Sequence, residues 1–171
     1  ATRCRTAILE KRAATAGRSV RPMLTSLSHA FIYVLDHDQA LDFYVDKLGL
    51  EVGVDADLGA FRWLTVHVPG RPETQLALAT PEMGHDDETA AAIRELVEKS
   101  GGNGMIFAVD DCRKTYEELL AKGVEFTQEP TEHFYGIDAG LRDPFGNPIR
   151  ITQPAPEPIK IPSPEEFAAN N

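Results

Sequence analysis

Apolar positions along the chain form short runs that favour strands, separated by stretches with helical spacing. The run from Leu27 to Leu35 predicts a strand. Asp36 or Asp38 can cap the helix that follows, because a carboxylate accepts the free N–H groups of a first helical turn. Apolar residues at positions 41, 44, 45 and 48 then lie on one helical face. Gly49 supplies the left-handed residue that ends such a helix.

Further apolar runs predict three short strands and a connector with its own helix. The strands are expected at residues 50–54, 61–68 and 75–79. The connector covers residues 81–101, where Asp86 or Asp87 can cap a helix that ends at Gly101.

The same order of elements then returns. Residues 105–109 predict a strand, Asp110 or Asp111 can cap the next helix, and Gly123 can end it. The strands expected after this helix cover residues 124–127, 132–135, 137–142 and 149–152. A turn at residues 143–147 precedes the last strand, because proline, glycine and asparagine favour turn geometry.

The two halves repeat with an offset of 75 residues, which relates Val34 to Val109 and Asp36 to Asp111. A single βαβββ unit of this size cannot bury its own sheet, so two units must pair. The sequence therefore predicts an α+β fold with two tandem βαβββ modules, paired into one curved-sheet domain with a cleft. Clefts between repeats are preferred ligand sites.

Domain boundaries follow from this repeat. We expect an N-terminal extension at residues 1–22, followed by the two-module domain at residues 23–153. Within that domain the modules cover about 27–80 and 102–153, with the helical connector at 81–101. Residues 154–171 form a proline-rich C-terminal tail, with five prolines in its first eleven positions, which cannot enter a sheet interior.

Length and composition narrow the class of protein. The chain has 171 residues, 42% hydrophobic and 26% charged, which is typical of a globular domain. Its net charge of −10 argues against a nucleic-acid partner, because phosphate binding needs a basic face. No apolar run approaches the roughly 18 residues of a membrane span. Cys4 and Cys112 make no disulfide framework, which favours a reducing compartment and predicts a cytoplasmic location.

The charge is unevenly distributed. Residues 1–22 hold six basic residues against one acidic residue, so this segment carries +5 and the remaining chain carries −15. Its Arg, Ala, Thr and Ser content is typical of a transit peptide. An upstream extension before a natural start at Met23 is the interpretation we favour, because nothing marks a cleavage site.

Two stretches carry a resemblance to a known family. The segment His29–Asp36 (HAFIYVLD), followed by ALDFY at 40–44 and LGL at 48–50, closely resembles the opening module of the vicinal oxygen chelate superfamily. That superfamily includes glyoxalase I, extradiol dioxygenases, fosfomycin-resistance enzymes and bleomycin-resistance proteins. The turn and strand at 143–149 resemble its closing element. The resemblance covers residues 27–153 and is specific for the fold rather than for the reaction.

The resemblance also implies where a metal centre would lie. Metalloenzymes of this superfamily place four His, Glu or Gln ligands in the cleft, two from each module. The matching positions here are His29, Gln75, Gly104 and Arg150. Glycine has no donor side chain and arginine is a fixed cation, so two of four ligands are missing. We therefore expect no metal centre and no cofactor. A divalent metal held by substitute donors such as His67 or His133 is the alternative.

Arg150 and His29 are the candidate catalytic residues. Arg150 alternates with Ile149 and Ile151, so it points into the cleft if the isoleucines pack under a helix. There it can clamp a carboxylate or phosphate, or else form a structural ion pair with a nearby acid. His29 suits proton transfer near neutrality, or else it is a histidine hydrogen-bonded locally.

Candidate ligand-binding residues are Gln75, Trp63, His67, His133 and Tyr135. Trp63 and His67 share one strand face, where they offer a stacking wall and a polar contact. The simpler interpretation of His67 is a rim position at a strand end. His133 and Tyr135 lie in a second cluster of acid, base and aromatic groups, which can also be a solvated edge strand.

Two function classes follow from these residues. The first is a glyoxalase/bleomycin-resistance-like protein that binds a small polar or aromatic molecule in the cleft without a metal. The −15 body favours a cationic ligand, whereas a cleft-facing Arg150 favours an anionic one. The second is a lyase, isomerase or dioxygenase that acts on a small oxygenated metabolite through His29. Whether the chain is an enzyme stays open, and the resemblance implies a homodimer.

Overall fold

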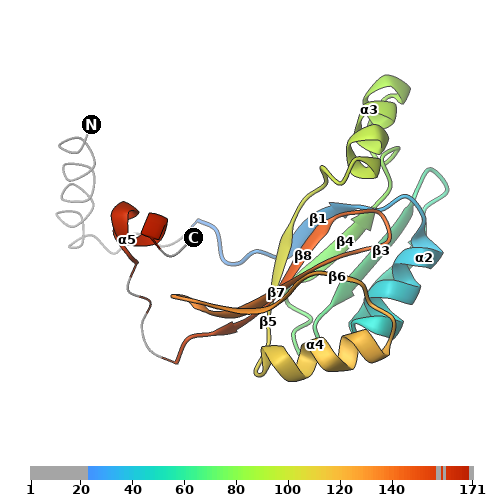
Figure 1. The fold of residues 1–171 in the computed structure, drawn as a ribbon. Helices are drawn as coiled ribbons and strands as arrows, with labels where there is room; N and C mark the ends of the chain where they lie inside the picture. Colours follow the sequence, from blue (N-terminus) through green and yellow to red (C-terminus); the bar gives the residue numbers. More distant parts are fainter. Residues whose placement is uncertain (1–22, 157–158, 160, 170–171) are drawn as a thin grey trace.

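The chain folds into two four-stranded sheets with helices packed against them (Figure 1). The computed structural model describes residues 23–156, 159 and 161–169. The first sheet has the strand order β1-β4-β3-β2 and the second has the order β5-β8-β7-β6. Within each sheet the first pair of strands is parallel and the other pairs are antiparallel. The α+β fold with two βαβββ modules is therefore confirmed.

The first module follows the predicted order closely. Its elements are β1 (His29–Tyr33), α2 (His37–Leu41), η1 (Asp42–Lys47), β2 (Glu51–Asp57), β3 (Arg62–His67) and β4 (Gln75–Ala79). Asp36 caps α2, because its carboxylate accepts the N–H of Gln39 at 2.8 Å. The predicted helix is divided, since its second half, η1, is a π-helix. Gly49 follows with a φ of 77°, the left-handed geometry expected of a helix-ending residue.

The second module begins after the connector helix α3 (Asp87–Glu98), which Asp86 caps. Its elements are β5 (Met105–Ala108), α4 (Cys112–Ala121), β6 (Phe126–His133), β7 (Gly136–Arg142) and β8 (Pro148–Pro154). Asp111, one of the two predicted candidates, caps α4. The two short strands expected at 124–127 and 132–135 are wrong, because β6 runs without interruption between them and turns after His133.

The tail ends in the short helix α5 (Pro164–Ala169). Ser163 begins it with a reciprocal pair of bonds. Its Oγ accepts the N–H of Glu166 at 3.3 Å, and its own N–H donates to the Glu166 carboxylate at 2.8 Å. No helix among the described residues is both long enough and apolar enough to cross a bilayer.

One hydrophobic core joins both modules on the helix-bearing sides of their sheets. Ile32 and Leu64 of the first sheet belong to the same buried cluster as Ile149 and Ile151 of the second. The helices contribute Tyr44 and other buried side chains to it. The opposite face of each sheet is therefore turned away from the core, and Arg150 lies on that face, as its alternation with the two isoleucines predicted.

Tyr44 connects the modules through the turn at residues 143–147. Its hydroxyl donates to the buried carboxylate of Asp143 at 2.8 Å, and burial followed by this negative charge raises the pKa of Tyr44 far above its usual value. Asp143 also accepts the backbone N–H groups of Phe145 at 3.0 Å and Asn147 at 2.8 Å. The turn therefore serves as a link between modules.

The free edge of β1 lies against the second module. Asn147 donates its side-chain amide to the carbonyl of Tyr33 at 2.8 Å, and Asn103 donates to the carbonyl of Phe31 at 3.5 Å. Gly102 permits this approach, because a Cβ there would lie 1.8 Å from the Asn147 side-chain oxygen. We call this part of the module boundary the closed end.

Candidate ligand-binding site

His29 and Gln75 are neighbours on the first sheet. They occupy paired positions at the start of the parallel strands β1 and β4. The His29 ring lies 5.8 Å from the Trp63 ring, and Phe31 lies 6.0 Å from the same ring. Trp63 reaches them from β3 because the intervening strand carries alanines on this face, including Ala77. Three of the predicted site residues, His29, Gln75 and Trp63, therefore share one surface.

The side chain of Gln75 is held within the protein. Its Oε1 accepts the hydroxyl of Thr65 at 2.6 Å, and its Nε2 donates to the carbonyl of Pro72 at 3.1 Å. Gly53 leaves the room for this arrangement, because a Cβ there would lie 2.4 Å from Gln75 Oε1. His29 contacts only Ser28 by hydrogen bonding, at 3.1 Å from Nδ1 to Oγ. No carboxylate among the described residues orients His29 as a base.

The strand register shows that Gln75 and Arg150 are not equivalent positions of the two modules. Val34 donates to Ala79 as Val109 donates to Thr152, so the offset between modules is 75 in the first strands and 73 in the last. The counterpart of Gln75 is therefore Pro148, which lies beside Gly104. Arg150 is the counterpart of Ala77.

Neither Gly104 nor either candidate for the fourth position, Pro148 by register or Arg150 by the turn motif, carries a metal donor. Proline and glycine carry no ligating side-chain atom, whereas a catalytic zinc site needs three protein ligands. No group of three or more His, Cys, Asp or Glu side chains suited to a metal ion occurs among the described residues. The predicted substitute donors do not meet: His67 lies at the end of β3 and His133 at the end of β6. The donor set does not fit the metal centre of the family.

Arg150 is held by an acid of its own chain. Its Nε donates to Asp138, which is only 1% exposed, and its Nη2 donates to Gln128 at 3.0 Å. Burial raises the pKa of Asp138, but the hydrogen bond and charge of Arg150 outweigh burial, so the net pKa is below the usual range. Of the two alternatives left by the sequence, the geometry supports the structural ion pair.

His133 and Tyr135 complete this cluster. The two rings stack with centroids 4.9 Å apart and an interplanar angle of 7°. His133 Nε2 lies 3.1 Å from one oxygen of Asp138, and the Tyr135 hydroxyl donates to the other oxygen at 3.2 Å. The cluster is distinct from the aromatic surface of the first sheet, because no hydrogen bond, ion pair or ring contact joins the two among the described residues.

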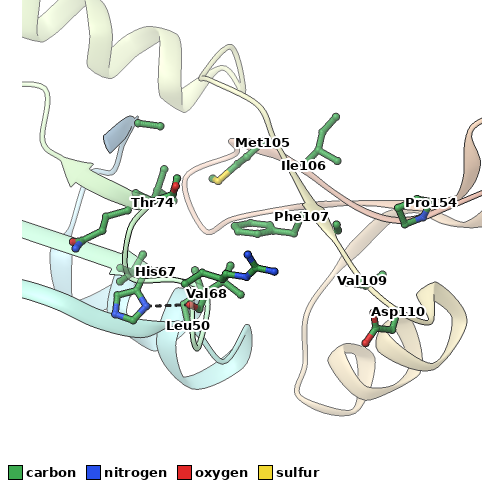
Figure 2. A pocket seen from close by; sticks show the side chains of 16 residues that line it. Leu50, His67, Val68, Thr74, Met105, Ile106, Phe107, Val109, Asp110 and Pro154 are labelled. Carbon is green, nitrogen blue, oxygen red and sulfur yellow. Dashed lines mark hydrogen bonds between the residues drawn. The ribbon is translucent and has the colours of Figure 1, made fainter. Parts of the chain in front are cut away.

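A pocket of about 710 Å³ lies between the modules (Figure 2). One wall comes from the first module and the other from the whole of β5 with the residues that follow it. Figure 2 shows Phe107 pointing from β5 across the gap toward the side that carries His67 and Thr74. The lining residues are Ala30, Leu50, Val66, His67, Val68, Arg71, Thr74, Gln75, Leu76, Met105, Ile106, Phe107, Ala108, Val109, Asp110 and Pro154.

The chemistry of this inter-module pocket is mainly apolar with a few polar groups. Leu76, Phe107 and Met105 are typical of its lining, which suits a hydrophobic or aromatic body. Arg71 of the first module and Asp110 of the second module place opposite charges in the pocket. Arg71 has a distant ionic partner, Glu73, at 3.9 Å.

Only two of the predicted ligand-binding residues, His67 and Gln75, line the pocket. Sequence reasoning missed Met105 and Phe107, because alternating apolar residues in a short strand are typical of a buried core. The first strand of each module stands at the edge of its sheet. This edge position would have indicated that residues of β5 can line a pocket.

Comparisons with known proteins agree with this geometry. The chain matches the Glyoxalase/Bleomycin resistance protein/Dioxygenase superfamily over residues 26–151. It is 35% identical over 122 residues to the uncharacterized protein YurT of Bacillus subtilis (strain 168), which covers 71% of this chain and 94% of that protein.

Solved structures extend the comparison. The crystal structure of UcmS2 is 40% identical with a TM-score of 0.71, covering 76% of this chain and 98% of the other. TnmS3, an antibiotic binding protein from Streptomyces sp. CB03234, shares the fold at 24% identity with a TM-score of 0.65, over 79% of this chain and 100% of the other. The chain belongs to the Glyoxalase/Bleomycin resistance protein/Dioxygenase superfamily.

Proposed function

We propose that this superfamily member binds a small molecule with an aromatic or apolar body in the inter-module pocket, without a metal centre. The observation that carries the proposal is the pocket itself. Its volume of about 710 Å³ falls within the roughly 300–1,000 Å³ of ligand pockets, and its lining is mainly apolar. The fold also serves TnmS3, an antibiotic binding protein, so it is able to accommodate a ligand.

The donor chemistry favours binding over metal-dependent catalysis. Gly104, Pro148 and Arg150 lie where the second module would supply metal ligands, and none of them carries a donor atom for a metal. Arg150 holds Asp138 and therefore has less capacity to clamp an anionic substrate. Metal analysis of the purified protein tests this part of the proposal. A stoichiometric divalent ion that is lost in His29→Ala would contradict it and would support the alternative of an enzyme acting through His29.

Binding is tested with 8-anilinonaphthalene-1-sulfonate, an aromatic probe whose emission rises in apolar surroundings. We expect saturable binding at one site, with energy transfer from Trp63, the single tryptophan of the chain. Ala30→Phe adds a ring inside the pocket at an exposed position and should weaken binding by about tenfold. Ala91→Phe, at an exposed position on α3, is the matched control and should bind as the wild type does. Equal affinity in both variants would overturn the proposed pocket.

The homodimer implied by the resemblance is part of the same proposal. Phe31 is 50% exposed on the open face of the first sheet, and Val54 is 41% exposed on β2. Burial of this apolar surface by a second copy would stabilise a dimer. Sedimentation equilibrium tests it: we expect a dimer mass that Phe31→Glu converts to a monomer mass. A monomer mass for the wild type would contradict it.

A further inference from the structure

The two edge strands, β1 and β5, end differently at the module boundary. Each stands at the edge of its sheet, and the repeat relates Phe31 to Ile106 and Tyr33 to Ala108. The carbonyls of Phe31 and Tyr33 are capped by side-chain amides at the closed end. The carbonyls of Ile106 and Ala108 have no such partner among the described residues.

The uncapped groups of β5 face the inter-module pocket. Val109 donates its backbone N–H to Thr152 of β8, so alternate residues of β5 direct their backbone groups toward β8. Ile106 and Ala108 lie at the intervening positions, and their N–H and C=O groups therefore point to the free edge. Both residues line the pocket. Ile106 is 69% exposed and Ala108 is also exposed, so water bonds to these backbone groups when no ligand is present, and a ligand in the pocket can replace that water.

Thr74 explains why the β5 side of the module boundary, which we call the open end, has no capping amide. With the offset of 73 that applies to the last strand of each module, Thr74 is the counterpart of Asn147. Thr74 lines the pocket but donates its hydroxyl to the carbonyl of Leu27 at 3.2 Å. Its side chain is shorter than that of asparagine and carries no amide, so nothing takes the place that Asn147 fills at the closed end.

We infer that the ligand of this pocket is recognised through amide groups that pair with the free edge of β5. This inference rests on the proposed function and names its ligand class. In an extended peptide the N–H and the C=O of one residue point to the same side, so they can pair with the free backbone groups of Ile106 and Ala108. These two positions are roughly 7 Å apart along a strand, the spacing of successive amides on one side of a dipeptide. Apolar substituents of such a molecule lie against Leu76 and Phe107.

The pocket favours a small amide-bearing molecule over a second copy of the chain. Its volume of about 710 Å³ corresponds to a drug-sized ligand. A partner strand would need the whole edge of β5, which has only four residues. The pocket also carries Arg71 and Asp110, which can hold the carboxylate and the amine at the two ends of a short peptide.

The test uses N-acetyl-leucyl-phenylalaninamide and its analogue methylated on both internal amide nitrogens. In nitrogen-15 NMR titrations of the full chain, the first probe should shift the backbone amide signals of Ile106 and Ala108. The methylated analogue should bind about tenfold more weakly, because the internal N–H groups of an extended dipeptide point to opposite sides, so methylation removes the one hydrogen bond that faces the edge and places a methyl group there. Equal binding of both probes would overturn the inference. It would leave the proposed function intact if anilinonaphthalene sulfonate still binds and Ala30→Phe still weakens that binding.

The variant Thr74→Asn provides a second test of the inference. The new amide should cap Ala108 as Asn147 caps Tyr33, and should weaken the dipeptide probe by about tenfold. Thr131→Asn, the same substitution at an exposed position of β6 outside the pocket, is the control and should bind the probe as the wild type does. Loss of a dimer in Thr74→Asn, with no change in probe affinity, would show that a second copy occupies the edge and would also overturn the inference.

Discussion

The two modules share one skeleton but differ at equivalent positions. In the first module the open face of the sheet is neutral and aromatic, with Trp63 lying over the strand that carries Ala77. In the second module the counterpart of Ala77 is Arg150, which forms an ion pair with the buried Asp138. The two modules therefore share one pattern of backbone hydrogen bonds, whereas the open faces of their sheets carry different side chains.

The two edges differ in the same way. The edge of β1 is capped by Asn103 and Asn147, while the edge of β5 borders the inter-module pocket. A closed end gives the modules a stable attachment, and an open end leaves space for a ligand. Stability and binding are thus expected to depend on opposite ends of one boundary.

The largest effect is expected at the closed end. Asp143→Ala removes the acceptor for the Tyr44 hydroxyl and for the backbone N–H groups of Phe145 and Asn147. Because these buried donors lose their partner, the free energy of unfolding should fall by about 3–4 kcal/mol. Urea unfolding measures it. Tyr44→Phe, which removes one of these bonds, should cost about 1 kcal/mol. Equal costs for both variants would contradict the role of the turn.

The charged face of the second module comes next. Arg150→Met leaves Asp138 buried without its cation, and should lower the free energy of unfolding by about 2 kcal/mol. The cost is below that of a fully buried pair, because the Arg150 side chain is 37% exposed. Arg113→Met, which breaks an exposed pair with Glu132, is the control and should cost about 0.5 kcal/mol or less.

The unfolding free energy at low pH should show the contribution of the charged face of the second module. The pKa of Asp138 is lowered in the folded state, so its contribution to stability is present above an unfolded pKa of about 3.9. That contribution is lost as the pH falls through the lower folded pKa. Asp138→Asn should therefore flatten the decline of unfolding free energy below about pH 4. Measurements of urea unfolding from pH 6 to pH 2 test it, and an unchanged slope would contradict the assignment.

Closing the open end should have a smaller effect of opposite sign. Thr74→Asn adds an amide for the carbonyl of Ala108, which should raise the free energy of unfolding by about 0.5–1 kcal/mol. Thr74→Val should instead destabilise slightly, because the bond to Leu27 is lost. Thermal unfolding compares the two variants without ligand. Destabilisation by both variants would show that an amide at position 74 does not cap the carbonyl of Ala108.

The smallest effect is expected where the two modules are most alike. Lys47 donates to the carbonyl of Gly123, and Lys122 donates to the carbonyl of Lys47 in the related position. Both bonds are exposed, so Lys47→Ala and Lys122→Ala should each cost about 0.5 kcal/mol or less. A cost above about 1 kcal/mol for either would contradict this ranking, because it exceeds what an exposed bond contributes.

Most of the fold could be predicted because its signals are local. Asp36 and Asp111 cap helices and Gly49 and Gly123 follow them, each through contacts within a few residues. The repeat then required two paired modules. The site could be predicted only in part. His29 and Gln75 are neighbours, but Arg150 is not the counterpart of Gln75, because the offset falls from 75 to 73 residues before the last strand.

The sequence by itself determined most of the elements and the two-module fold, since these depend on residue types and on spacing within one module. Only the tertiary structure decided which acid holds Arg150 and which edge strand stays open. Both depend on contacts between residues far apart in the chain, such as Asn147 with Tyr33, and on the absence of an equivalent amide at Thr74. A spacing along the sequence cannot specify such contacts, because one shortened loop changes which side chains face one another.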